Sequence, residues 1–71
     1  MKKIKTLKLE SSTQATLGGT PYDVIVNDKN IGTIAVVDED DIIELTIKLL
    51  IRKGFEISDT YEIYDLLGME A

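Results

Sequence analysis

The sequence predicts one small α+β domain over residues 1–71: a mostly antiparallel sheet of three or four strands, a long helix packed on it, and a short C-terminal helix. Three observations lead to this expectation. The chain is long enough for only one core. Residues 22–37 read as two β-rich runs around a turn. Residues 38–53 begin with acids, end with bases and are apolar between them.

The first predicted strand covers residues 3–9, KIKTLKL. Leu7 and Leu9 flank Lys8 in alternation, and lysines along an outer strand discourage pairing with other chains. The following stretch, residues 11–21, is rich in Ser, Thr and Gly and ends in a turn signal at residues 18–21. It is long for a connection in so small a domain, so we expect a functional loop or a further strand there.

A hairpin is predicted over residues 22–37, with Asp28, Lys29 and Asn30 as a three-residue loop and Asn30 in the left-handed conformation. The matching register sets Val24 opposite Ile34. One face of the hairpin then points to the core, because side chains alternate along a strand. That face carries Tyr22, Val24, Val26, Gly32, Ile34 and Val36.

The acidic run after the hairpin is interpreted as the start of a helix. Asp38 is a good N-cap, and the next three acids fall in the first turn, where unpaired N–H groups and the helix dipole favour carboxylates. Arg52 and Lys53 suit the other end, with Gly54 as the stop. Metal binding is the weaker reading, because side chains within one helical turn point in different directions.

The long helix has an unusually wide apolar surface. Its apolar residues between 42 and 51 cover about two-thirds of the circumference, more than a helix lying on a sheet normally buries. Residues 55–57 are expected to form a short strand or a turn. Ser58 or Asp59 then caps a second helix, with Glu62 as a capping-box partner and Gly68 as the stop. We expect self-association to cover what the second helix leaves exposed.

Composition argues against most chemistry. There is no His and no Cys, so the usual general bases and soft nucleophiles are missing. The glycines at 18 and 19 precede a strand rather than a helix, which does not fit a phosphate loop. We therefore expect no enzymatic activity, no catalytic residues, no cofactor and no metal site.

Charge is unevenly distributed. Residues 1–10 carry four lysines against one glutamate, whereas the rest of the chain carries four basic residues against twelve acids, for a net charge of −5. An acidic body repels phosphate, so we expect no direct nucleic-acid binding. No apolar run is long enough to cross a bilayer. We expect a cytoplasmic protein that does not bind membranes.

These features favour a non-catalytic protein-interaction module, an inhibitor or adaptor that self-associates as a homodimer. The partner is expected to be a protein. The residues predicted to bind it are Tyr61, Tyr64, Ile47, Leu50 and Ile51, since tyrosines are enriched in interface hot spots and the long helix has apolar surface to cover. One alternative is an acidic mimic of nucleic acid that sequesters a DNA- or RNA-binding protein. Another is a minor structural component of a larger assembly, such as a phage particle.

Overall fold

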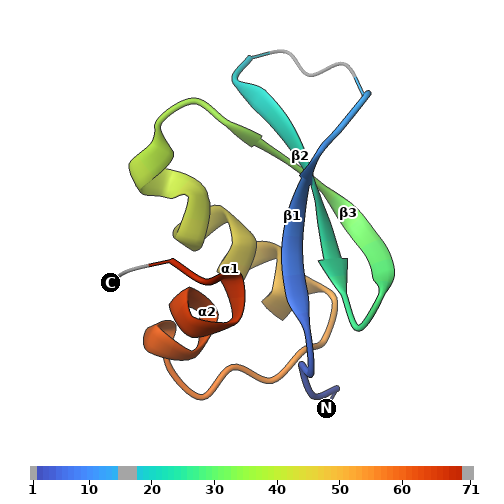
Figure 1. Ribbon diagram of the computed structural model, residues 1–71, viewed down its shortest axis with the longest axis vertical. Helices are drawn as coiled ribbons and strands as arrows, with labels where there is room; N and C mark the ends of the chain where they lie inside the picture. Colours follow the sequence, from blue (N-terminus) through green and yellow to red (C-terminus); the bar gives the residue numbers. More distant parts are fainter. Residues whose placement is uncertain (1, 15–17, 70–71) are drawn as a thin grey trace.

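The computed structural model describes residues 2–14 and 18–69, and these form the predicted α+β fold. Three strands, β1 (Leu7–Ser11), β2 (Thr20–Val26) and β3 (Lys29–Val36), make an antiparallel sheet in the order β1-β2-β3. A short 3₁₀ turn, η1 (Glu39–Asp41), leads into α1 (Ile42–Arg52), and α2 (Thr60–Leu67) follows. Both helices lie on the same face of the sheet (Figure 1). Within the described residues the sheet has three strands, the smaller of the two numbers expected from the sequence.

The first strand begins later than predicted, at Leu7 instead of residue 3. It pairs with β2 through Leu7 opposite Val26 and Leu9 opposite Val24. Residues 3–6 lie outside the sheet because their backbone groups are bound elsewhere, as described below. The predicted segment at residues 11–21 contributes the last residue of β1 and the first two of β2, and its residues 15–17 lie outside the described part.

The turn signal before β2 has a clear steric cause. Gly19 has a φ of 77°, and a Cβ at this position would lie 2.7 Å from the backbone carbonyl carbon and oxygen of Val36. Only glycine allows β2 to start this close to the end of β3. Gly19 therefore serves strand geometry.

The β2–β3 hairpin forms, but the predicted loop and register were wrong. The loop is two residues long, with Asn27 and Asp28 at φ values of 51° and 67°. Such primed turns match the right-handed twist of the strands, and Asn and Asp are among the residues that tolerate them. As a result Val24 pairs with Gly32, not with Ile34. The error is two residues, so the predicted core face is unchanged.

Asn27 also fastens the N-terminal segment to the hairpin. The backbone N–H groups of Lys5 and Thr6 donate to Asn27 Oδ1 at 2.7 and 3.1 Å. Asn27 Nδ2 donates to the carbonyl of Lys3 at 3.0 Å. These bonds occupy backbone groups that an extended strand at residues 3–6 would need for pairing. The segment also forms a single parallel bridge between Lys2 and Phe55, which takes the place of the short strand considered for residues 55–57.

The predicted caps form, but Asp38 caps the 3₁₀ turn η1 that leads into α1, whereas Asp59 caps α2 directly. The Asp38 carboxylate accepts a hydrogen bond from the N–H of Asp40 at 3.0 Å. The Asp59 carboxylate caps α2 by accepting from the N–H of Glu62 at 2.9 Å. Glu62 in turn accepts from the N–H of Ser58, one residue before the cap, at 3.0 Å. Side chains thus satisfy N–H groups that a helix N-terminus leaves without partners.

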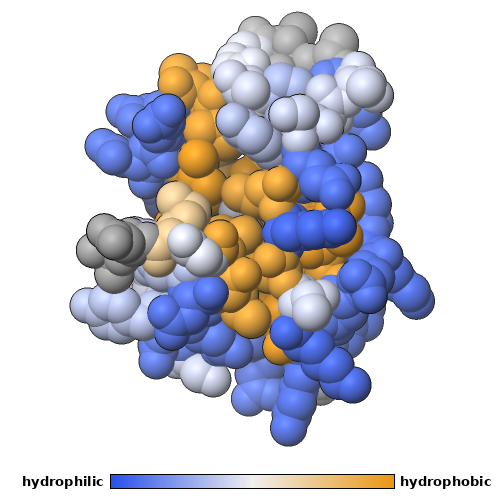
Figure 2. Space-filling view, in the orientation of Figure 1, coloured by the Kyte–Doolittle hydropathy of each residue, from blue (hydrophilic) through white to orange (hydrophobic). Residues whose placement is uncertain are grey.

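The core lies between the sheet and the two helices. Val24 and Val26 from β2 meet Leu50 from α1 and Ile63 from α2, and all four are essentially inaccessible to solvent. On the face shown in Figure 2, apolar surface remains visible between the helices and the sheet. The cover is therefore incomplete, which agrees with the wide apolar surface read from the sequence of α1.

Thr46 is the buried polar side chain of this core. It lies on α1 with no solvent exposure, and its Oγ1 has no hydrogen-bond partner among the described residues. A buried hydroxyl without a partner loses its hydration without compensation.

Two substitutions of Asn27 distinguish the contribution of its side-chain hydrogen bonds from that of its left-handed backbone conformation. Asn27→Gly keeps the left-handed backbone but removes three hydrogen bonds, and should lower the free energy of unfolding by about 1–3 kcal/mol. Asn27→Ala adds the strain of a left-handed alanine, roughly 1 kcal/mol more. Urea denaturation measures both values, and hydrogen exchange at Lys5 and Thr6 should accelerate. Equal stability of wild type and Asn27→Gly would contradict the role of the side chain.

Thr46→Val should stabilise the domain by about 1 kcal/mol, because a methyl group of similar size replaces the unsatisfied hydroxyl. Thermal or urea unfolding gives the change. Thr46→Ser is the matched control: it keeps the hydroxyl, loses the methyl and should be less stable than wild type. A destabilised Thr46→Val protein would show that the hydroxyl has a partner.

Candidate functional site

A groove of about 410 Å³ runs between the two helices. We call it the α1–α2 groove. It is lined by Asp40, Ile43, Glu44, Ile47, Lys48, Thr60 and Tyr64. The isoleucines come from one side of α1, and Tyr64 comes from the facing side of α2. The groove is therefore an apolar cleft with charged side chains from α1 at its border.

Helical spacing explains why these side chains lie at the margin of the core. Thr46 and Leu50 point into the core, so Ile47 lies about 100° round the helix from Thr46, on the flank facing α2. Tyr64 follows the fully buried Ile63 in the same way. Both Ile47 and Tyr64 are half-buried, which leaves part of each side chain available to a ligand.

A second hollow, of about 420 Å³, continues along the same flank of α1. Its lining is Ile51, Gly54, Phe55, Glu56 and Ile57. Ile51 is four residues after Ile47, so the two side chains are neighbours on the helix surface. Ile51 is 62% exposed, which is high for an isoleucine in a helix. Ile47 and Ile51 place the two hollows next to each other along α1; the first hollow borders α2, and we call the pair the apolar strip beside α2.

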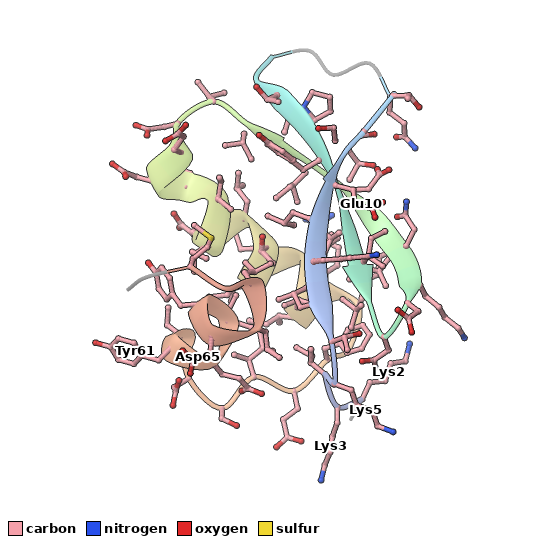
Figure 3. All side chains as sticks on the ribbon, in the orientation of Figure 1. Lys2, Lys3, Lys5, Glu10, Tyr61 and Asp65 are labelled. Carbon is pink, nitrogen blue, oxygen red and sulfur yellow. The ribbon has the colours of Figure 1, made fainter. Side chains whose placement is uncertain are left out.

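The five residues predicted to bind a partner are thus in different places. Ile47 and Tyr64 line the α1–α2 groove, and Ile51 lines the adjoining hollow. Tyr61 is 67% exposed in the first turn of α2, and its ring points away from the body of the molecule (Figure 3). Leu50 has no exposed surface and belongs to the core. It cannot touch a partner while the domain is folded.

Charges around the groove are exposed and weakly paired. The Glu44 and Lys48 side chains form an i,i+4 ion pair at 3.3 Å, with both side chains about two-thirds exposed. Such surface pairs contribute about 0–1 kcal/mol to stability, so the charged side chains at the border of the groove can rearrange when a ligand binds. Within residues 2–14 and 18–69, no group of three or more acidic side chains is placed to hold a metal ion. In the same residues no helix is long and apolar enough to cross a membrane.

The molecule has a basic end that is larger than the lysine-rich start indicated by the sequence. Lys2, Lys3 and Lys5 lie together where the chain begins (Figure 3). Lys29 lines the same small hollow as Lys2, and Lys53 precedes Gly54, whose carbonyl accepts from the N–H of Lys2 at 3.1 Å. The lysine-rich start was visible in the sequence. The contributions of residues 29 and 53 depend on tertiary contacts.

Comparison with known proteins gave no match: no protein-family model, no curated protein and no solved structure matches this chain.

Leu50 and Ile51 provide a direct check of which apolar residues hold the fold and which remain for binding. Leu50→Ala should lower the free energy of unfolding by about 2–5 kcal/mol, because it leaves a cavity in the core. Ile51→Ala should change it by about 0.5 kcal/mol or less, as expected for an exposed position. Urea denaturation of the two variants measures both effects. Similar losses would contradict the different burial of the two side chains.

Proposed function

We propose that this protein is a non-catalytic interaction module, an inhibitor or adaptor, that binds another protein through the α1–α2 groove and self-associates. The observation that carries the proposal is the apolar strip beside α2. It contains the half-buried Ile47 and Tyr64 and continues to Ile51, which is mostly exposed.

The composition of this strip supports the proposal. Protein interfaces concentrate binding energy in aromatic and large aliphatic side chains that sit beside pockets, with polar groups at the rim. Tyr64 and Ile47 form such a pocket wall, and Asp40, Glu44 and Lys48 form the rim. Burial of apolar surface is worth about 25 cal/mol per Å², so covering Ile51 and its neighbours would favour association.

Self-association follows from the same surface. A domain of this size buries a small fraction of its unfolded surface, and covering an exposed apolar strip would add stability. A homodimer and a heteromeric complex would then compete for the same side chains. This competition is a simple way for a small module to remain soluble until its partner is present.

A second candidate is an acidic mimic of nucleic acid, and one observation favours it. Two acids line the α1–α2 groove: Asp40 from η1 and Glu44 from α1. A basic nucleic-acid-binding protein would fit such a border. Its affinity would depend on exposed charges and would fall steeply with salt.

Affinity capture from a lysate of the host cell tests the proposal. We expect the wild-type protein to retain one stoichiometric protein through washes at about 0.1 M and then about 0.5 M salt, because apolar contacts are little screened. Ile47→Asp and Tyr64→Ala should each lose it, while Thr6→Asp, a change at an exposed position that does not line the groove, should keep it. Circular dichroism confirms that each variant is folded.

Other results decide between the readings. Release at the higher salt would favour acidic mimicry. Retention of the partner by both groove variants would contradict the groove as the binding site. If the purified protein sediments as a monomer at every concentration tested, the self-association part is wrong.

A further inference from the structure

The outer edge of β3 has no partner in the described part of the chain. The strand order leaves β3 with β2 on one side only. An edge strand of this kind has backbone N–H and C=O groups that face away from the sheet. Between Asn30 and Val36 the strand has no charged residue and no proline, which are the usual protections of an edge.

The opposite edge of the sheet is protected. The five residues of β1 include Lys8 and Glu10, whose exposed side chains form an ion pair at 3.2 Å. Helix α2 also packs against β1. On β3 the one irregularity is a bulge at the hairpin end, opposite Val24 and Ile25. From Gly32 to Val36 the strand pairs regularly, so this stretch can accept a further strand.

A groove of about 300 Å³ lies along this free edge. We call it the β3–α1 groove. It is lined by Thr33, Ile34 and Ala35 from β3 and by Leu45, Lys48, Leu49 and Arg52 from α1. A strand added to β3 would direct alternate side chains toward the flank of α1, where Leu45 and Leu49 offer apolar contact.

The packing of α1 on β3 restricts which kind of segment can pair with the edge of β3. Helix α1 packs on β3, and a Cβ on Gly32 would lie 3.3 Å from Leu49 Cδ1. If a second copy paired its own β3 here, its α1 would follow. Adjacent strands are about 4.8 Å apart, whereas packed helices need about 8–10 Å. A helix over the added strand would have to pack beside α1, whereas an extended segment that carries no helix meets no such requirement and fits this edge most simply.

The charges around the β3–α1 groove indicate which side chains the bound segment would carry. Lys48 and Arg52 stand on the helix side of the groove, and Lys29 begins the strand. No ion pair of Arg52 is found among the described residues, and Lys48 shares only the exposed pair with Glu44. The acids at residues 38–41 lie beyond the other end of β3. Carboxylates are therefore favoured beside Arg52 and disfavoured past Val36.

We propose that β3 binds an extended acidic segment of another protein as a fourth strand, with side-chain carboxylates directed to Arg52 and Lys48. The backbone of β3 supplies affinity and the β3–α1 groove supplies selectivity. The β3–α1 groove and the α1–α2 groove share only Lys48 among their lining residues, so the inference goes beyond the proposed function and does not depend on it.

The test uses a displayed library of random peptides of about ten residues, a length that spans an edge strand. We expect enriched peptides to alternate apolar residues with Asp or Glu. Arg52→Glu should weaken an enriched peptide about tenfold or more. Lys53→Glu, the same charge change at an exposed neighbour outside the groove, should have a much smaller effect. Both positions are exposed, so both variants should fold.

N-methylated versions of the enriched peptide provide the signature of strand addition. Methylation of one alternating set of backbone nitrogens should abolish binding, and methylation of the other set should leave it largely intact, because only one set faces β3. Enrichment of no peptide, enrichment without acids, or equal sensitivity of both sets would overturn the proposal. Loss of binding in Ile47→Asp but not in Arg52→Glu would overturn it too, by placing the peptide in the α1–α2 groove.

Discussion

The packing of α1 against both the sheet and α2 is the contact on which the rest of this structure depends. Leu50 and Thr46 lie at its centre with no solvent exposure, and Ile63 closes it from α2. A chain of 71 residues without cysteine has no disulfide to support so small a core. One helix therefore contributes to two interfaces at once, and its sequence is apolar over more of its circumference than a helix on a sheet requires.

That double role leaves incomplete cover on both flanks of α1. On one flank, α2 is only eight residues long and leaves the α1–α2 groove and the exposed Ile51. On the other flank, the sheet ends at β3 and leaves the β3–α1 groove. The residues that stabilise the fold and those that remain for binding are thus neighbours on α1. A partner at either groove would cover apolar side chains of α1 that α2 and the sheet leave exposed.

Charge follows the same geometry. The acids that start α1 lie near the end of β3, and the bases that end α1 lie near its beginning, because α1 returns along the strand (Figure 1). The hydrogen bonds between Asn27 and the N-terminal segment hold this segment, with Lys2, Lys3 and Lys5, at the basic end. A protein with a net charge of −5 therefore presents a concentrated basic end, and net charge alone is a poor guide to what each surface binds.

The sequence by itself determined the fold class, the core face of the hairpin and the carboxylate caps at Asp38 and Asp59. These depend on local chemistry: strand alternation, and carboxylates that satisfy free N–H groups. Of the five residues predicted to bind a partner, Ile47 and Tyr64 line the α1–α2 groove. The tertiary structure alone decided the hairpin register, because a two-residue shift leaves the alternation unchanged. It also decided that Leu50 is core and Ile51 surface. A helix with apolar residues over most of its circumference does not show which side will meet the sheet, and only packing supplies that answer.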